Sequence, residues 1–217
     1  MLPLGLRNRL AELILDAFDD DDARRTLEAL AMGCGQDAGV VGAAAASRLV
    51  GLGWFDSLGP DRVRMRGSYR PYREALGRRV TAALDAVRQV GPGAEPAAPL
   101  GRLDRAARLA DAGLYFEVHE LLEPAWLVAE GSERVALQGL IQVAVALQHL
   151  ANDNGEGATS LLGEGLAKLA AAPGALPIET TRWEATLGAV LIALREEAPL
   201  PALPPWPRAG ELTWRAS

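Results

Sequence analysis

Residues 114–150 read LYFEVHELLEPAWLVAEGSERVALQGLIQVAVALQHL, and this stretch decides how the rest of the chain is interpreted. It contains both histidines of the chain, with acidic and amide residues placed inside otherwise apolar segments. Two sets of residues recur at helical spacing and so share one helix face each: His119, Glu123 and Trp126 in the first, and Gln138, Gln142 and His149 in the second. The pattern predicts two helices, each with a polar group of side chains in an apolar surface.

The short segment 129–131 separates these two helices, so we expect them to form an antiparallel pair. A symmetric turn would place His119 level with Gln142, and Glu123 level with Gln138. Apolar neighbours flank all four residues. The sequence therefore predicts a polar cluster that is mostly buried, with its members within hydrogen-bond reach of one another.

His149 is expected to lie outside this cluster. It follows Gln142 by seven residues, which is about 10 Å along a helix axis. That separation is too large for His149 to share one metal ion with His119. We expect His149 to cap its helix near Asn152 or to face solvent.

Pro124 lies inside the first of the two helices. It lacks the N–H that would bond the Glu120 carbonyl, and its ring crowds that carbonyl. We expect either a kink between Glu120 and Pro124 or a new helix with Pro124 at its first position. Both arrangements leave an unpaired carbonyl beside His119 and Glu123.

His119 and Glu123 are candidate ligands of one divalent metal ion, because an imidazole and a carboxylate one helical turn apart can reach the same ion. Glu120 is the candidate general base for hydrolysis at such a site. Catalytic zinc usually has three protein ligands, and oxygen-rich surroundings suit Mn²⁺ or Mg²⁺ better. The alternative is a structural hydrogen-bond network in which Glu123 orients His119 and the glutamine amides satisfy the remaining groups. Both interpretations are open at this point.

The composition is that of a globular protein, with 49% hydrophobic and 23% charged residues in 217. A single cysteine, Cys34, excludes an intramolecular disulfide and a cysteine-based zinc site. The first residues lack the pattern of a signal peptide, and the longest apolar runs are too short or too polar for a membrane span. The expected location is the cytoplasm, with no membrane partner.

Arginines are concentrated in the first part of the chain, although the net charge is -6. Seven arginines between residues 62 and 79 are accompanied by a single acidic residue, Glu74: Arg62, Arg64, Arg66, Arg70, Arg73, Arg78 and Arg79. They form a local basic stripe in an acidic protein. The net charge argues against a nucleic-acid-binding protein overall, and Arg62, Arg64 and Arg66 are the candidates for any such contact. A small molecule is the other candidate partner.

The N-terminal part predicts helices at 7–18, 23–32 and 38–52, a hairpin over 62–66 and a further helix at 72–90. Three helices before a hairpin is the element order of a winged-helix domain, in which Arg62, Arg64 and Arg66 would contact phosphate. The third helix offers only Ser47 and Arg48 to read bases. A small helical domain with a solvated arginine face is the alternative.

The predicted fold class is all-α, an antiparallel helical bundle preceded by a smaller, mainly helical domain that carries a short β-hairpin. The expected boundaries are an N-terminal domain at 1–90, a Pro- and Gly-rich linker at 91–99, the bundle at 100–198 and a proline-rich extended tail at 199–217. Trp206 is a candidate anchor for the tail.

Several segments resemble the domain of unknown function 309 family of bacteria and archaea, over roughly 103–169. They are FEVHELLEPAW, LQGLIQVAVALQH, and Asn154-Gly155 followed by Gly157-Ala158 and Leu161-Leu162. The resemblance implies a small all-α domain with an H-x3-E-x2-W motif that has been proposed to bind metal. In this chain the motif residues are His119, Glu123 and Trp126. The resemblance also implies metal-dependent hydrolase activity. Pro124 and residues 1–95 lie outside the family pattern.

Two functional hypotheses follow. The first is a metal-dependent hydrolase of a small substrate, with His119 and Glu123 as ligands and Glu120 as the base. The second is a non-catalytic helical module that binds a ligand or partner, with the N-terminal part as a nucleic-acid-binding domain.

Overall fold

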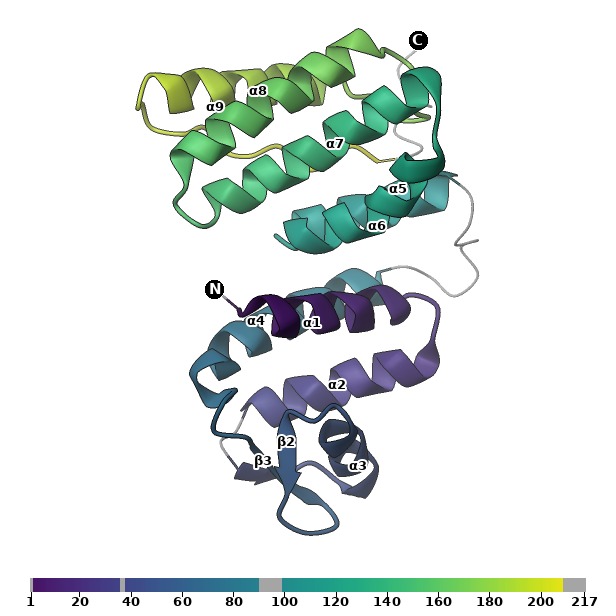
Figure 1. The fold of residues 1–217 in the computed structure, drawn as a ribbon, viewed down its shortest axis with the longest axis vertical. Coiled ribbons are helices and arrows are strands. Elements are labelled where there is room, and N and C mark those ends of the chain that lie inside the picture. Colours follow the sequence, from purple (N-terminus) through teal and green to yellow (C-terminus); the bar gives the residue numbers. More distant parts are fainter. Residues whose placement is uncertain (1, 36–37, 90–98, 209–217) are drawn as a thin grey trace. The chain divides into compact units, whose positions relative to one another are not determined.

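The computed structural model describes residues 2–35, 38–89 and 99–208. The chain divides into two compact units, Met1–Gly91 and Pro92–Ser217 (Figure 1). No helix in the described ranges is both long and apolar enough to cross a membrane.

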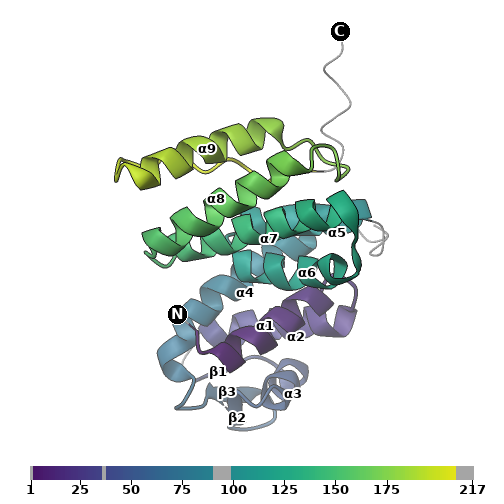
Figure 2. The same cartoon turned by 45° about the horizontal axis from the view of Figure 1, so that its top comes forward.

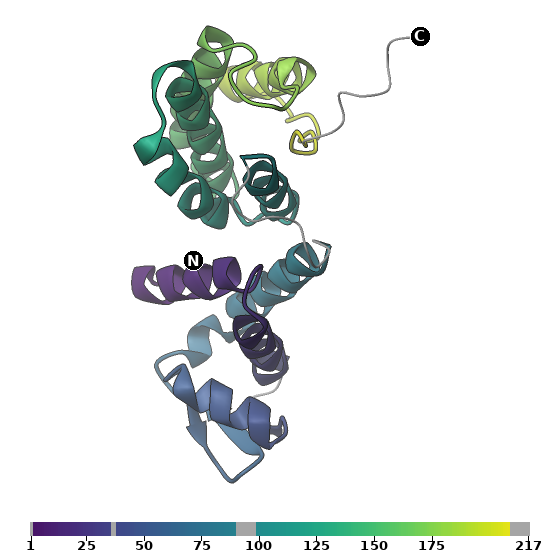
Figure 3. The same cartoon turned by 90° about the vertical axis from the view of Figure 1, so that its right-hand side faces the viewer.

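The N-terminal unit combines helices with a small antiparallel sheet. Its elements are α1 (Leu4–Asp16), α2 (Asp21–Gly35), β1 (Ala38–Val40), α3 (Ala43–Gly51), β2 (Phe55–Ser57), β3 (Arg62–Met65), a 3-10 turn (Arg70–Tyr72) and α4 (Arg73–Arg88). The strand order is β1-β3-β2. Figure 3 shows α3 and the strands side by side at one end of this unit. The sheet presents Val63 and Met65 to the core and Arg62 and Arg64 to solvent, because strand residues alternate between faces.

The hairpin expected near residues 62–66 is present as β2 and β3, but the helix predicted from residue 38 begins later. Residues 38–40 instead form a third strand, in which Gly39 pairs with Val63. Gly42 has a φ of 84°, which stops the chain from continuing directly from strand to helix. The alanine-rich composition predicts one continuous helix over 38–52, but pairing with β3 places residues 38–40 in a strand.

The C-terminal unit is a helical bundle, which confirms the all-α prediction. Its helices are α5 (Pro99–Asp111), α6 (Tyr115–Val128), α7 (Gly131–Leu150), α8 (Gly155–Ala171) and α9 (Thr181–Arg195). Helix α6 packs against α5 and α7, and α8 lies between α7 and α9 (Figure 2). The predicted linker at 91–99 falls almost entirely outside the described residues.

Helices α7 and α8 approach closely where two glycines face each other. A Cβ atom on Gly165 would lie 2.9 Å from the Gly139 carbonyl oxygen, and one on Gly139 would lie 2.9 Å from Cγ of Leu169. Such distances are below ordinary van der Waals contact, so only glycine permits this separation of the helices. The contact fixes which face of α7 is turned toward α8.

The turn between α6 and α7 is held by Arg134. Its Nη1 lies 3.0 Å from the Trp126 carbonyl oxygen, 3.1 Å from that of Leu127 and 3.3 Å from that of Ala129. The guanidinium also lies over the Trp126 ring, 4.7 Å from its centroid. Arg134 therefore satisfies the carbonyl groups that the end of α6 leaves free.

The proline-rich tail is described as far as residue 208 and is fastened to the bundle by Trp206. The Trp206 side chain is 4% exposed, and its ring centroid lies 4.7 Å from that of Trp183 on α9. The Trp206 backbone N–H donates to Asp111 at the end of α5, and Arg208 forms an ion pair with the same carboxylate. These contacts hold the extended tail against two helices.

Candidate functional site

Three side chains that can bind a metal ion lie together on α6. One ligand atom from each of His119, Glu120 and Glu123 lies within 4.8 Å of the other two. All three side chains are half-buried. Their closeness follows from the helix itself, because residues i and i+4 share a face and the adjacent residue can reach back toward it.

Within this cluster, His119 is hydrogen-bonded to Glu120. The Nδ1 atom of His119 lies 2.9 Å from Oε1 of Glu120, so the imidazole donates from Nδ1 to the carboxylate. This bond leaves Nε2 of the neutral ring with a lone pair. Metal-binding histidines usually donate their other N–H in this way, which fixes the orientation of the ring.

The donor set fits a divalent ion. It offers one imidazole nitrogen and carboxylate oxygens, a combination that zinc and manganese accept. Ligand atoms about 2.1 Å from a tetrahedral ion would lie roughly 3.4 Å apart, so ligand atoms up to 4.8 Å apart must rotate toward one another to bind one ion. His119 and Glu120 are 29% and 35% exposed, which leaves the cluster open to solvent.

Pro124 occupies the interior of α6, which runs without interruption from Tyr115 to Val128. The carbonyl of Glu120 therefore lacks its usual partner at position i+4, as expected from the proline. This oxygen lies between His119 and Glu123 in the sequence.

The structure brings together only part of the polar cluster expected from the sequence. Gln142 donates from Nε2 to Oε2 of Glu164 on α8, at 2.8 Å, instead of approaching His119. The Gln138 side chain forms no hydrogen bond with another residue in the described part of the chain. The close approach of α7 and α8 at their glycines explains the difference, because it turns the Gln142 face of α7 toward α8.

His149 lies in the last turn of α7, outside the metal-ligand cluster, and contacts the residue that caps α8. Asn154 caps this helix by accepting a hydrogen bond from the Gly157 N–H at 3.0 Å. Its amide nitrogen therefore points to Nδ1 of His149, 2.8 Å away. Nδ1 acts as the acceptor, so the neutral His149 ring carries its proton on Nε2.

Sequence reasoning did not single out Arg134, Asn154 and Glu164 as the residues that hold Trp126, His149 and Gln142. It also missed the buried charged residues Arg105 and Glu117, which are 6% and 0% exposed. In the sequence, each of these two residues is a charged residue at a position whose helical neighbours are apolar, and that pattern could have identified them. Glu117 lies two positions before His119 on α6, so it does not share the helix face of the cluster.

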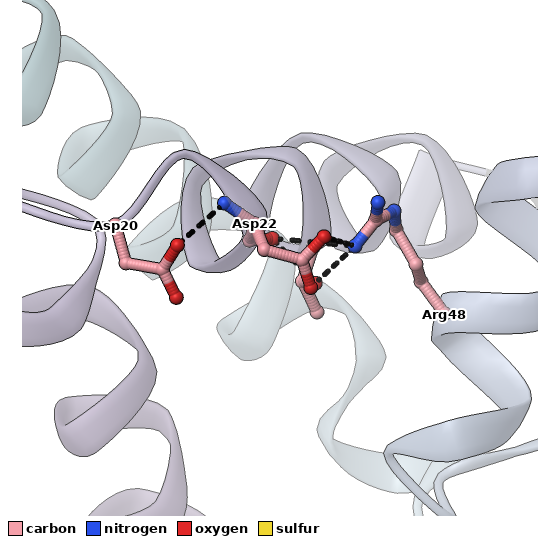
Figure 4. A network of polar contacts seen from close by, with 4 residues as sticks. Asp20, Asp22 and Arg48 are labelled. Atoms are coloured by element: carbon pink, nitrogen blue, oxygen red, sulfur yellow. Dashed lines mark hydrogen bonds and ion pairs between the residues drawn. The ribbon is translucent and has the colours of Figure 1, made fainter.

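The arginine stripe is largely engaged within the N-terminal unit. Arg66 forms an ion pair with Asp56 at 2.8 Å, whereas Arg62 and Arg64 are exposed. Arg48, the basic residue of α3, is held by Asp22 (Figure 4). The helix that would read bases in a winged-helix domain therefore directs its cation to an internal carboxylate.

Cys34 is unsuited to nucleophilic chemistry. It is 8% exposed, and burial raises the pKa of its thiol to about 12, despite the opposing influence of Arg73. The thiolate is the reactive form of cysteine. We therefore place no catalytic role on Cys34.

Residues 103–161 match the model of a family described as Domain of unknown function (DUF309). The match confirms the resemblance for the part of the chain that contains α6 and α7, including His119, Glu120 and Glu123. Comparison with curated proteins and with solved structures gives no match.

Proposed function

We propose that the α6 cluster binds one divalent metal ion and that the C-terminal unit is a metal-dependent hydrolase of a small substrate. The observation that carries this proposal is the convergence of His119, Glu120 and Glu123 within 4.8 Å. Partial exposure supports access of a small molecule to these groups. An ion held there would supply Lewis-acid catalysis of hydrolysis.

Each residue of the cluster has a distinct role in this proposal. His119 would bind through Nε2, because Nδ1 is engaged with Glu120. Glu123 would bind through its carboxylate from one helical turn further along. Glu120 orients His119 through Oε1, and its other oxygen is the candidate acceptor for the proton released in hydrolysis.

Metal binding is tested by elemental analysis of the full chain purified without added metal, followed by calorimetric titration with Zn²⁺ and Mn²⁺. We expect a single site whose affinity falls at least tenfold in His119→Ala and in Glu123→Gln. His149→Gln is the matched control, because His149 is bonded to Asn154 and lies outside the cluster. Equal metal affinity in His119→Ala and His149→Gln would overturn the assignment.

Hydrolysis is tested separately with small ester, amide and phosphate substrates, in the presence of the tightest-binding metal. Glu120→Gln keeps a hydrogen-bond acceptor for His119 but cannot take up a proton, so we expect metal binding with strongly reduced turnover. Metal binding without turnover of any substrate class by the unmodified chain would favour the alternative, a non-catalytic ligand-binding module.

A further inference from the structure

A pocket of about 420 Å³ lies between α9 and the proline-rich tail of the C-terminal unit. Its wall contains Trp183 and Trp206, three prolines of the tail, and the charged residues Glu179 and Arg182. Its volume falls within the range of small-molecule sites, about 300–1,000 Å³. None of the α6 cluster residues lines it, so it is a second site.

The apolar wall of the pocket is held in place. Trp183 and Trp206 are 6% and 4% exposed and pack edge to face, and Asp111 fixes the backbone at Trp206. The indole Nε1 of Trp206 is buried without an acceptor among the described residues. Buried indole N–H groups usually have a partner. Because this nitrogen has almost no exposed surface, it offers no donor to a ligand in the pocket.

The rim of the pocket carries one charge of each sign. Arg182 is exposed and forms no ion pair with any residue in the described ranges. Oε1 of Glu179 accepts a hydrogen bond from the Thr181 N–H at 2.6 Å, and hydrogen bonding to Thr181 lowers the pKa of the Glu179 carboxyl. Glu179 is therefore ionised at neutral pH and gives the rim a negative charge that can face a cationic group.

We propose that this pocket binds a small zwitterion with an apolar body, namely an amino acid with an aromatic side chain. Arg182 would receive the carboxylate and Glu179 the ammonium group, while the proline rings and indoles pack against the aromatic ring. A molecule with one charge would leave an opposite rim charge without a counterpart. The proposal is independent of metal binding at α6.

The test uses the full chain and three related probes: L-phenylalanine, 3-phenylpropanoate, which lacks the ammonium group, and 2-phenylethylamine, which lacks the carboxylate. Tryptophan fluorescence reports binding. We expect phenylalanine to bind at least threefold more tightly than either single-charge probe. Arg182→Gln should weaken binding of phenylalanine and phenylpropanoate only, and Glu179→Gln should weaken binding of phenylalanine and phenylethylamine only.

Two controls make the result specific to this pocket. Arg195→Gln changes an exposed arginine at the other end of α9 and should leave all three affinities unchanged. Trp206→Phe should reduce the fluorescence response and leave that of Trp183, whereas Trp126→Phe should leave the response unchanged. The proposal is overturned if no probe gives a saturable response, if the three probes bind equally, or if Arg182→Gln behaves like Arg195→Gln.

Discussion

Replacing Gly165 with alanine is expected to destabilise the C-terminal unit, although alanine is the better helix former. A Cβ atom at this position would lie 2.9 Å from the Gly139 carbonyl oxygen, 3.0 Å from Cγ2 of Val143 and 3.1 Å from its backbone nitrogen. Two of these three atoms belong to the α7 backbone, so α7 and α8 must move apart. Overpacking of this kind costs about 1–3 kcal/mol. The gain in helix propensity recovers about 1 kcal/mol, which leaves a net loss of up to about 2 kcal/mol.

Gly188 provides the matched control, because it also lies inside a helix, α9, but a Cβ atom there would meet nothing within 4 Å. Gly188→Ala should therefore gain about 0.5–1 kcal/mol. Urea unfolding followed by tryptophan fluorescence gives both free energies of unfolding. The two variants should shift the midpoint in opposite directions. If Gly165→Ala is as stable as Gly188→Ala, the close approach of α7 and α8 is not the reason for glycine at position 165.

Three further outcomes follow from other contacts. Arg134→Met should lower the free energy of unfolding by about 2 kcal/mol, because it removes a charged donor from three carbonyl groups. A loss below about 0.5 kcal/mol in urea unfolding would contradict the capping role. Burial raises the pKa of the Cys34 thiol from 9.0 to about 12, so the unfolded chain loses this proton at a lower pH than the folded chain does. The neutral thiol therefore contributes stability below pH 9, and this contribution is lost as the pH rises toward 12. Cys34→Ala should remove that part of the alkaline pH dependence, and parallel pH profiles of the two proteins would contradict it. The full chain should show no salt-sensitive binding of duplex DNA in fluorescence anisotropy, because Arg48 and Arg66 form ion pairs with carboxylates of the same unit. Binding at low salt that weakens in Arg62→Gln would support the winged-helix hypothesis instead.

The sequence predicted helix positions well where apolar residues recur over several turns. Helix α6, expected from the spacing of His119, Glu123 and Trp126, spans Tyr115–Val128. The metal candidates His119 and Glu123 are neighbours because they share that helix. Local spacing determines such a contact, so no knowledge of tertiary packing is needed.

Contacts between helices were harder to predict. The expected pairing of Gln142 with His119 depended on which face of α7 meets α6, and the glycines that bring α8 close to α7 decide that face. Glycine at position 165 has no apolar side chain, so a periodicity argument assigns it no role. Likewise, β1 depends on pairing with a strand more than twenty residues away, which local composition cannot reveal.

The attachment of the tail to Asp111 has a consequence for the order in which this bundle folds. The hydrogen bond from Trp206 joins residues that are 95 positions apart, whereas the helix pairs α6 and α7, and α7 and α8, are joined by short turns. Closing a long loop costs more chain entropy than closing a short one, so the helical hairpins can form before the tail docks. We therefore expect the tail to dock after the helical hairpins have formed.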